Sequence, residues 1–376
     1  MKKSLFLAAV LSAVLLPAFS VEWGGIFKNN SKISSNFKTA SFKQSDSIYL
    51  WSNQYLNKDG SLYASEEILY KFDYYSSYKI IVNTVDIDLL KITGDFELEG
   101  SNLFFGAGRF IANDLSNVVF AQNCDGLSVK YTLPLVEFSM YAGYTGLLNS
   151  NAVVMLDSDG TSFTPANKVY ALSHRFVPLS AGVSFPVLFG NQSIELQGNA
   201  FIDLAATDKS RYYGEFKISG PIANSVYYNV VTVLGSESFK NLTNYSAVDF
   251  YYYPIRTVMV DGGIEWASGD EGIFKPFTGI TSRPVCNSAA YPETSGVLAV
   301  KAVAGVSLKD FYISGTGKVV MPSALSYSVK GFEADVSASY NIFTDLKVGL
   351  DATVFVDLKD STDNNFTATL RVALAF

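Results

Sequence analysis

Residues 365–376 read NFTATLRVALAF, and this stretch decides the fold of the chain. Every second residue from Phe366 onward is apolar, whereas Thr367, Thr369 and Arg371 between them are polar. A period of two gives a β-strand one apolar and one polar face. A strand needs about 9–11 tilted residues to cross a bilayer, and this stretch is long enough. The pattern therefore predicts a membrane-spanning strand with one face in lipid and the other in water.

The same stretch ends on an aromatic residue, Phe376. In this it resembles the C-terminal strand of Gram-negative outer-membrane β-barrels. The resemblance implies that Phe376 belongs to the assembly signal that the outer-membrane insertion machinery reads. It also implies contact with outer-membrane lipid and a barrel with a lumen.

Residues 1–20 have the pattern of a signal peptide. They begin with two lysines, continue with the apolar stretch 5–16 (LFLAAVLSAVLL), and end with the small residues Ala18 and Ser20. We expect cleavage after Ser20, export from the cytoplasm, and a mature chain of residues 21–376. The alternative, an uncleaved anchor helix, fits poorly because the apolar stretch is short and small residues follow it.

The composition agrees with a membrane barrel. Hydrophobic residues make up 48% of the chain and charged residues 17%, with 23 Tyr and 28 Phe available for aromatic girdles at the membrane interfaces. No later stretch has the roughly 18 consecutive apolar residues of a transmembrane helix. The formal net charge of −7 becomes −9 when Lys2 and Lys3 are removed. Because no basic stripe is present, nucleic acid is not an expected partner.

Alternation recurs along most of the chain. It is clearest in 192–204, 257–268, 330–340 and 345–357, and weaker amphipathic runs fall near 211–219, 225–234, 245–253, 296–308 and 310–321. Further upstream, the expected strands are 21–28, 45–56, 62–75 and 78–98, the last being one long strand or a hairpin that turns near Asp88.

The connections between these strands alternate in length. Tight turns are expected at Leu133-Pro134, Gly190-Asn191, Pro254, Lys309-Asp310 and 341–344, and longer links at 112–124, 146–167, 235–244, 269–295 and 358–364. Bacterial barrels have short periplasmic turns and longer extracellular loops. The pattern predicts one all-β, antiparallel up-and-down transmembrane barrel over 21–376, with an even number of strands, about 18 or else 16. A soluble secreted β-sandwich or propeller would also alternate, but its outward face should be polar.

The polar faces of these strands are expected to line the lumen. They carry more carboxylates than basic groups, which implies a wet lumen or a dense network of ion pairs. The predicted pore-lining residues are Glu195, Asp203, Arg211, Glu215, Lys217, Asp249, Asp261, Glu265, Lys301, Lys318, Glu333, Asp335, Asp345, Lys347, Asp351, Asp357 and Arg371.

Residues 104–110 (FFGAGRF), followed by Asp114 and then by Asp125-Gly126, resemble a segment of alginate-export and related solute-specific porins. Those families pair a strand Gly-Arg with a downstream Asp-Gly. The resemblance implies that Arg109 lies on the pore wall. The acidic lumen of this chain departs from an anionic-sugar channel.

The sequence offers little for catalysis. Its only histidine, His174, is expected at the rim near the end of a strand, and no hydrolase or metalloprotease motif surrounds it. One histidine and two distant cysteines, Cys124 and Cys286, are too few for a tetrahedral metal site. Both cysteines fall in expected loops, where they form a disulfide or remain two free thiols. The acids in 157–161 (DSDGT) predict a turn first and a weak cation site second.

The sequence therefore predicts a protein that is not an enzyme and that binds no cofactor or metal. The leading hypothesis is an outer-membrane porin, a passive and mildly cation-preferring channel for small hydrophilic solutes. A first alternative is a narrow or plugged barrel that acts as an adhesin or surface antigen through loops 146–167 and 269–295. A second is a fatty-acid type transporter, although the polar residues 29–44 do not resemble the hatch of such a protein.

Overall fold

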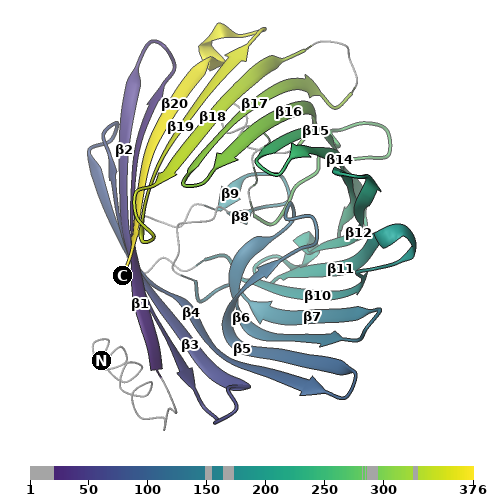
Figure 1. The fold of residues 1–376 in the computed structure, drawn as a ribbon. Helices are drawn as coiled ribbons and strands as arrows, with labels where there is room; N and C mark the ends of the chain where they lie inside the picture. Colours follow the sequence, from purple (N-terminus) through teal and green to yellow (C-terminus); the bar gives the residue numbers. More distant parts are fainter. Residues whose placement is uncertain are drawn as a thin grey trace.

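The computed structural model is a closed antiparallel β-barrel of 18 strands. It describes residues 21–148, 155–163, 173–281, 283, 285, 295–324 and 329–376. Each strand pairs with its neighbours in sequence, and the last strand pairs with the first, which closes the ring (Figure 1). The predicted fold class and the preferred strand number are both confirmed. The expected signal peptide lies outside the described residues and stays a prediction.

The barrel wall consists of long strands with even spacing. They are β1 (Val21–Ser35), β2 (Ala40–Tyr55), β3 (Leu62–Tyr75), β4 (Ile80–Leu98), β5 (Ser101–Asn113), β6 (Ala121–Thr132), β7 (Glu137–Tyr144), β10 (Phe176–Phe185), β11 (Ser193–Asp203), β12 (Arg211–Ala223), β13 (Val226–Glu237), β14 (Asn241–Ile255), β15 (Val258–Ala267), β16 (Val297–Leu308), β17 (Phe311–Pro322), β18 (Gly331–Asn341), β19 (Leu346–Asp357) and β20 (Asn365–Ala375). Three short 3₁₀ helices lie in the connections, at Phe189–Asn191 (η1), Thr207–Lys209 (η2) and Ser361–Asp363 (η3). A separate two-stranded sheet, β8 (Met155–Leu156) with β9 (Ser162–Phe163), lies inside the ring (Figure 1).

The two ends of the barrel differ in their connections, as the sequence predicts. At the end that holds Val21 and Phe376 the hairpins are tight, and Ser225 and Lys309 make two of the turns at φ of 64° and 51°. At the other end long links follow β7 and β15. Following the usual orientation of bacterial barrels, we call the tight end the periplasmic end and the end with the long links the extracellular end.

Two hairpins differ from the prediction, and one open alternative is decided. The expected long link 235–244 is wrong, because β13 continues to Glu237 and a tight turn with Ser238 and Phe239 at positive φ leads directly into β14. The first hairpin is longer than expected, since β1 extends to Ser35 and β2 begins at Ala40. Residues 80–98 form one strand, so the hairpin alternative at Asp88 is wrong; instead the register with β3 shifts at Glu67/Ile68.

The two faces of the wall have different chemistry. On β19 the exposed Leu350 and Val356 point outward, whereas Thr353, Phe355 and Asp357 are buried and point inward. The outward faces of β15–β20 carry only apolar residues and glycine, which suits lipid contact. No helix among the described residues is long and apolar enough to cross a membrane.

The links after β5, β7 and β15 meet inside the barrel. Ile280 donates its N–H to the carbonyl of Val119 at 2.7 Å, and Leu156 donates to the carbonyl of Ile280 at 2.9 Å. Apolar side chains from these links pack against the inner wall in one buried cluster that includes Phe120, Phe201 and Phe277. The cluster fills the part of the interior next to β5–β6 and β10–β15.

Candidate functional site: the barrel lumen

The structure places the sequence-predicted pore residues on the inward face of the wall, with two of them at its mouth. Apart from Arg109, which is two residues from the exposed Ile111, those in strands lie on the face opposite to the exposed aliphatic residues of their own strand; Asp351, for example, follows Leu350, which is 52% exposed. Asp345 lies in the tight turn before β19, and Lys347 lies at the first residues of that strand, so both are exposed at the mouth of the barrel.

Six of the predicted inward carboxylates form ion pairs with a base, and in four of these pairs the base lies on an adjacent strand. Glu195 lies opposite Lys217 in the register, and Glu333 lies opposite Lys318. The distances between charged atoms are 3.0 Å for Lys217–Glu195, 3.3 Å for Lys318–Glu333, 2.6 Å for Lys301–Asp249 and 2.6 Å for Arg371–Asp351. Lys301 also lies 3.9 Å from Asp261, and Arg283 lies 3.6 Å from Glu265.

Three predicted carboxylates have other partners. Asp335 accepts a hydrogen bond from Thr353 at 2.6 Å. Asp357 accepts the backbone N–H groups of Lys359 and Asp360. Asp203 lies 3.0 Å from Nε2 of His174. The only histidine of the chain is therefore the partner of this carboxylate at the extracellular rim. The lumen is therefore a network of ion pairs and hydrogen bonds rather than a surface of free charges.

Arg109 is the most tightly held of these residues. Its Nε and Nη2 donate to the two carboxylate oxygens of Asp125 at 2.8 and 2.9 Å, and its Nη1 lies 3.2 Å from Asp86. It also donates to the carbonyls of Ile87, at 2.6 Å, and Leu147, at 3.2 Å. Arg109 thus joins β4, β5 and β6 to the link that follows β7.

Two glycines make room for this contact. Gly108 lies opposite Gly126, just as Arg109 lies opposite Asp125. Gly108 has φ of +123°, and a Cβ there would lie 2.2 Å from the carbonyl oxygen of Leu90. The Gly-Arg and Asp-Gly pairs that the sequence singled out are therefore in direct contact, although Arg109 is buried rather than open to the lumen.

The link 114–120 is folded around one carboxylate. Asp114 accepts the N–H groups of Ser116, Val119 and Phe120 at 2.9, 3.1 and 2.6 Å. Ser116 in turn donates its N–H to Glu215 on the inner wall at 2.9 Å. The link is thereby fixed against β11 and β12 inside the barrel.

Two further bonds hold the link after β15. Arg211 donates to the carbonyls of Gly279 and Leu156 at 2.8 and 2.5 Å, and Tyr213 donates to the carbonyl of Thr278 at 2.6 Å. Arg211 and Glu215, predicted as pore-lining, are therefore buried beneath these links and serve as their anchors.

The opposite side of the lumen is more open. The side chains of Arg371 and Asp351 face inward, yet they are 48% and 34% exposed. Lys43 on the adjoining β2 is also exposed, at 37% of its side chain. Inward-facing charge with this much accessible surface indicates a solvent-filled space along β18–β20, β1 and β2.

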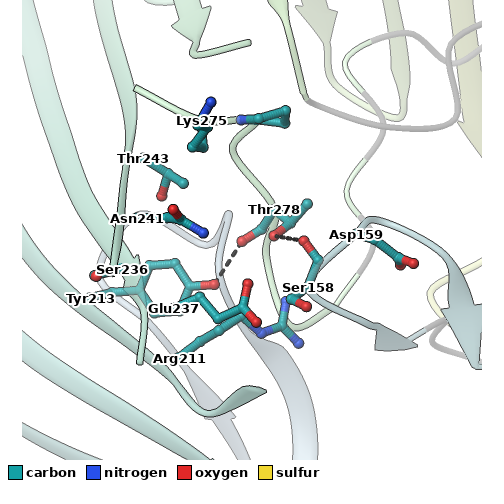
Figure 2. Close-up of a pocket in the computed structure, with 11 residues that line it drawn as sticks. Ser158, Asp159, Arg211, Tyr213, Ser236, Glu237, Asn241, Thr243, Lys275 and Thr278 are labelled. Atoms are coloured by element: carbon teal, nitrogen blue, oxygen red, sulfur yellow. Dashed lines mark hydrogen bonds between the residues drawn. The ribbon is translucent and has the colours of Figure 1, made fainter. Parts of the chain in front are cut away.

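A cavity of about 330 Å³ lies between the links and the wall near the extracellular end. Figure 2 shows polar side chains converging on it from three parts of the chain: Arg211 and Tyr213 from β12, Ser158 and Asp159 from the link after β7, and Lys275 and Thr278 from the link after β15. Glu237, Ser236, Asn241 and Thr243 complete the lining, together with Pro276. The cavity therefore presents both signs of charge together with hydroxyl and amide groups.

Ion pairs also connect the extracellular links to one another. Lys209 lies 3.0 Å from Asp157. Burial raises the pKa of the Asp157 carboxyl, but the hydrogen bond from Lys209, the N–H of Ser158 and the charge of Lys209 outweigh it, so this pKa is lowered. Residues 157–161 form the predicted turn, with Gly160 at φ of +82°. No group of three potential ligand residues that could hold a metal ion occurs in the described part of the chain.

Several solved barrels of Pseudomonas aeruginosa have a similar fold. OccK3 (OpdO) aligns over 98% of this chain and 98% of its own, with a TM-score of 0.64 and 10% identity. OpdK with vanillate aligns over 95% of this chain and 98% of its own (TM-score 0.60, 10% identity), and OccK2 (OpdF) in complex with glucuronate over the same shares (TM-score 0.61, 12% identity).

This chain has the fold of the OccK and Opd barrels. At these identities the likeness concerns the fold alone. No protein-family model matches the sequence, and no curated protein matches it either.

Within this OccK/Opd-like barrel, sequence reasoning missed a group of inward bases on the first strands. Lys28 and Lys32 on β1, Lys43 on β2 and Lys71 on β3 all share the inward face, since Lys32 lies opposite Lys43 and Ser47 lies opposite both Lys28 and Lys71. Asp73 lies between Lys43 and Lys71, at 3.8 and 3.1 Å. Lys28 and Lys32 lie an even number of positions apart, which places them on one face of a strand. The polar residues on the other face hid this alternation in the sequence.

Sequence reasoning also misplaced Cys124. It lies in β6 rather than in a loop, and its thiol is free and buried in the interior apolar cluster. The predicted link ended at residue 124, whereas β6 already begins at Ala121, so Cys124 lies three residues inside the strand. Cys286 lies outside the described residues; of the two alternatives, the free thiol of Cys124 agrees with unpaired cysteines and not with a disulfide.

Proposed function

We propose that the protein is a passive channel in an outer membrane that lets small hydrophilic solutes cross through the barrel. The apolar outward faces of β15–β20 suit lipid, and the ion-paired inward face suits water. Barrels of 16–18 strands are wide enough to leave an aqueous passage where side chains do not fill them.

One observation carries this proposal. Arg371 and Asp351 face the interior on the same side as Lys43, and all three keep a large exposed fraction. On the other side, Glu215 and Arg211 are buried beneath the inward-folded links. The passage therefore runs along β18–β20, β1 and β2, off the axis of the barrel.

The selectivity of this passage follows from the charges beside it. The carboxylates Asp335 and Asp357 have no basic partner within 4.0 Å among the described residues, whereas Asp351 and Glu333 do. The bases Lys28, Lys32, Lys43 and Lys71 reduce the acid excess that the sequence predicted. We propose a weak cation preference, which should fade as the Debye length falls from about 10 Å at 0.1 M salt to about 3 Å at 1 M.

The polar cavity beside Arg211 is the proposed first site for a solute. Its volume of about 330 Å³ is at the small end of the range of small-molecule pockets, roughly 300–1,000 Å³. Two solved structures with this fold contain a small carboxylate, vanillate in OpdK and glucuronate in OccK2. In this chain the exposed Lys275 attracts a carboxylate, while Asp159 and Glu237 favour solutes that also carry hydroxyl or amino groups.

Planar-bilayer recordings of purified protein test the proposal. We expect discrete conductance steps, and in a gradient of potassium chloride a small reversal potential with the sign of cation preference. Clear anion preference would contradict the proposed selectivity. Protein that inserts without conducting would contradict the channel. It would favour the plugged-barrel alternative, in which the buried interior cluster blocks the lumen.

A further inference from the structure

The outward face of the first hairpin carries polar side chains where lipid contact predicts apolar ones. Asn29 and Ser31 on β1, and Gln44 and Asp46 on β2, point to the same side as the exposed Ile33, Ile48 and Leu50. We call these four residues the outer polar patch. No strand from β15 to β20 has a polar residue on this face.

The outer polar patch lies within the apolar band rather than at its edge. Along the strands it is bounded by Ile33 and Phe42 on one side and by Phe27 and Ile48 on the other. Across the strands, Asn29 lies opposite Val372, and Asp46 lies opposite Phe72. Apolar residues therefore surround the patch in the plane of the wall.

Internal hydrogen bonds satisfy only part of the patch. Asn29 and Gln44 each donate one amide hydrogen to Oδ1 of Asp46, at 2.5 and 2.9 Å, and Ser31 donates to the side-chain oxygen of Gln44 at 2.7 Å. Among the described residues no hydrogen bond reaches Oδ2 of Asp46, and no base lies within 4.0 Å of this carboxylate. Each amide also retains a second hydrogen.

Lipid chains offer no partner for these groups. Charged substitutions on the lipid face of a barrel are destabilising, most of all near the middle of the bilayer. An ionisable residue inside the membrane is therefore expected to have a partner and a function.

We propose that the outer polar patch is a docking surface for a second copy of this chain. The patch is self-complementary, because it holds free amide hydrogens and a free carboxylate oxygen side by side. Across a two-fold axis, Asn29 and Gln44 of one copy donate to Asp46 of the other, and the reverse contacts form by symmetry. The surrounding Phe27, Ile48 and Val372 then pack as the apolar rim of the same interface.

Apolar substitution of the patch tests the proposal without harming the barrel. The double variant Gln44→Leu/Asp46→Leu keeps the outward face compatible with lipid, so it should insert normally and remain heat-modifiable. A matched control is Thr232→Val/Ser246→Ala, which removes another outward cross-strand hydrogen bond, of 2.8 Å, on β13 and β14.

Light scattering in mild detergent gives the mass of each protein. We expect at least two chains per particle for the wild type and the control, and one chain for Gln44→Leu/Asp46→Leu. In isolated membranes, Gln44→Cys should form an oxidant-dependent dimer band that the parent protein, with its own two cysteines, does not form. The proposal would be overturned if the wild type is a single chain by light scattering and Gln44→Cys forms no dimer band. It would also be overturned if the double variant has the mass of the wild type. Neither assay depends on conductance, so the result stands apart from the proposed channel.

Discussion

Phe376 lies against Gly25 at the seam where the barrel closes. Gly25 and Phe376 exchange two backbone hydrogen bonds, of 2.8 and 3.0 Å, beyond the last residue of β20. A Cβ on Gly25 would lie 2.5 Å from the ring of Phe376, so glycine leaves the space that the ring occupies. The terminal aromatic residue therefore contributes to closure as well as to the apolar outer face.

Gly25→Val should displace the ring of Phe376 and lower the yield of closed barrel. Deleting Phe376 should lower it further, because the two backbone hydrogen bonds are lost as well. The heat-modifiable band of outer-membrane fractions on gels measures this yield. Gly317→Ala is the control, since a Cβ there meets nothing within 4 Å. Normal levels of both seam variants would show that this contact is dispensable.

Leu370 and Thr369 separate the two faces of β20. Leu370 is exposed on the outer face, so Leu370→Arg should destabilise the folded barrel by about 2–4 kcal/mol if it lies near the middle of the bilayer. Thr369 faces inward, opposite Asp351, so Thr369→Arg should be tolerated. Unfolding by denaturant in lipid vesicles compares the two; equal effects would contradict the assignment of faces.

Arg109 should be far more important for stability than Arg371. Removing one partner of a buried ion pair costs about 3–5 kcal/mol, so Asp125→Asn should strongly lower the unfolding free energy. The pair of Arg371 with Asp351 is half-exposed, and Asp351→Asn should change stability by only about 0–1 kcal/mol. The same denaturant titration distinguishes them, and a similar small loss in both variants would argue against Arg109 as an anchor.

The ion pair of Asp157 with Lys209 should make the extracellular links sensitive to acid. The pKa of Asp157 is lowered in the folded protein, so its stabilising contribution is present above the ordinary carboxyl value of about 3.9 and is lost as the pH falls through the lower folded value. We expect open-channel current noise to rise below about pH 4. Asp157→Asn should show that noise at pH 6 already; unchanged noise in the variant would refute a role for this pair.

The sequence predicted the wall much better than the interior. Strand β3 has the predicted bounds, because outward Ile68, Tyr70 and Phe72 alternate with inward Lys71 and Asp73 in its second half. The first hairpin was shortened in the prediction because Asn29, Ser31, Gln44 and Asp46 put polar residues on the outer face as well. Polar residues on both faces remove the periodicity on which strand prediction depends.

The interior contacts could not be predicted from periodicity. Glu215 and Arg211 were correctly placed on the inward face, but their burial depends on links that return into the lumen from distant parts of the chain. Glu215 binds Ser116, and Arg211 binds Gly279 and Leu156. Only the Gly-Arg and Asp-Gly pairs around Arg109 gave a local signal of such a contact.

Chemical modification at neighbouring positions of β20 tests most directly whether an aqueous path follows this side of the wall. Thr369→Cys places a thiol on the inward face, and Leu370→Cys places one on the lipid face; the parent protein controls for Cys124 and Cys286. A positively charged, thiol-reactive reagent should lower the single-channel conductance of Thr369→Cys and leave the other two proteins unchanged. Absence of conductance in all three, or an equal effect at both positions, would contradict a channel along β18–β20, β1 and β2.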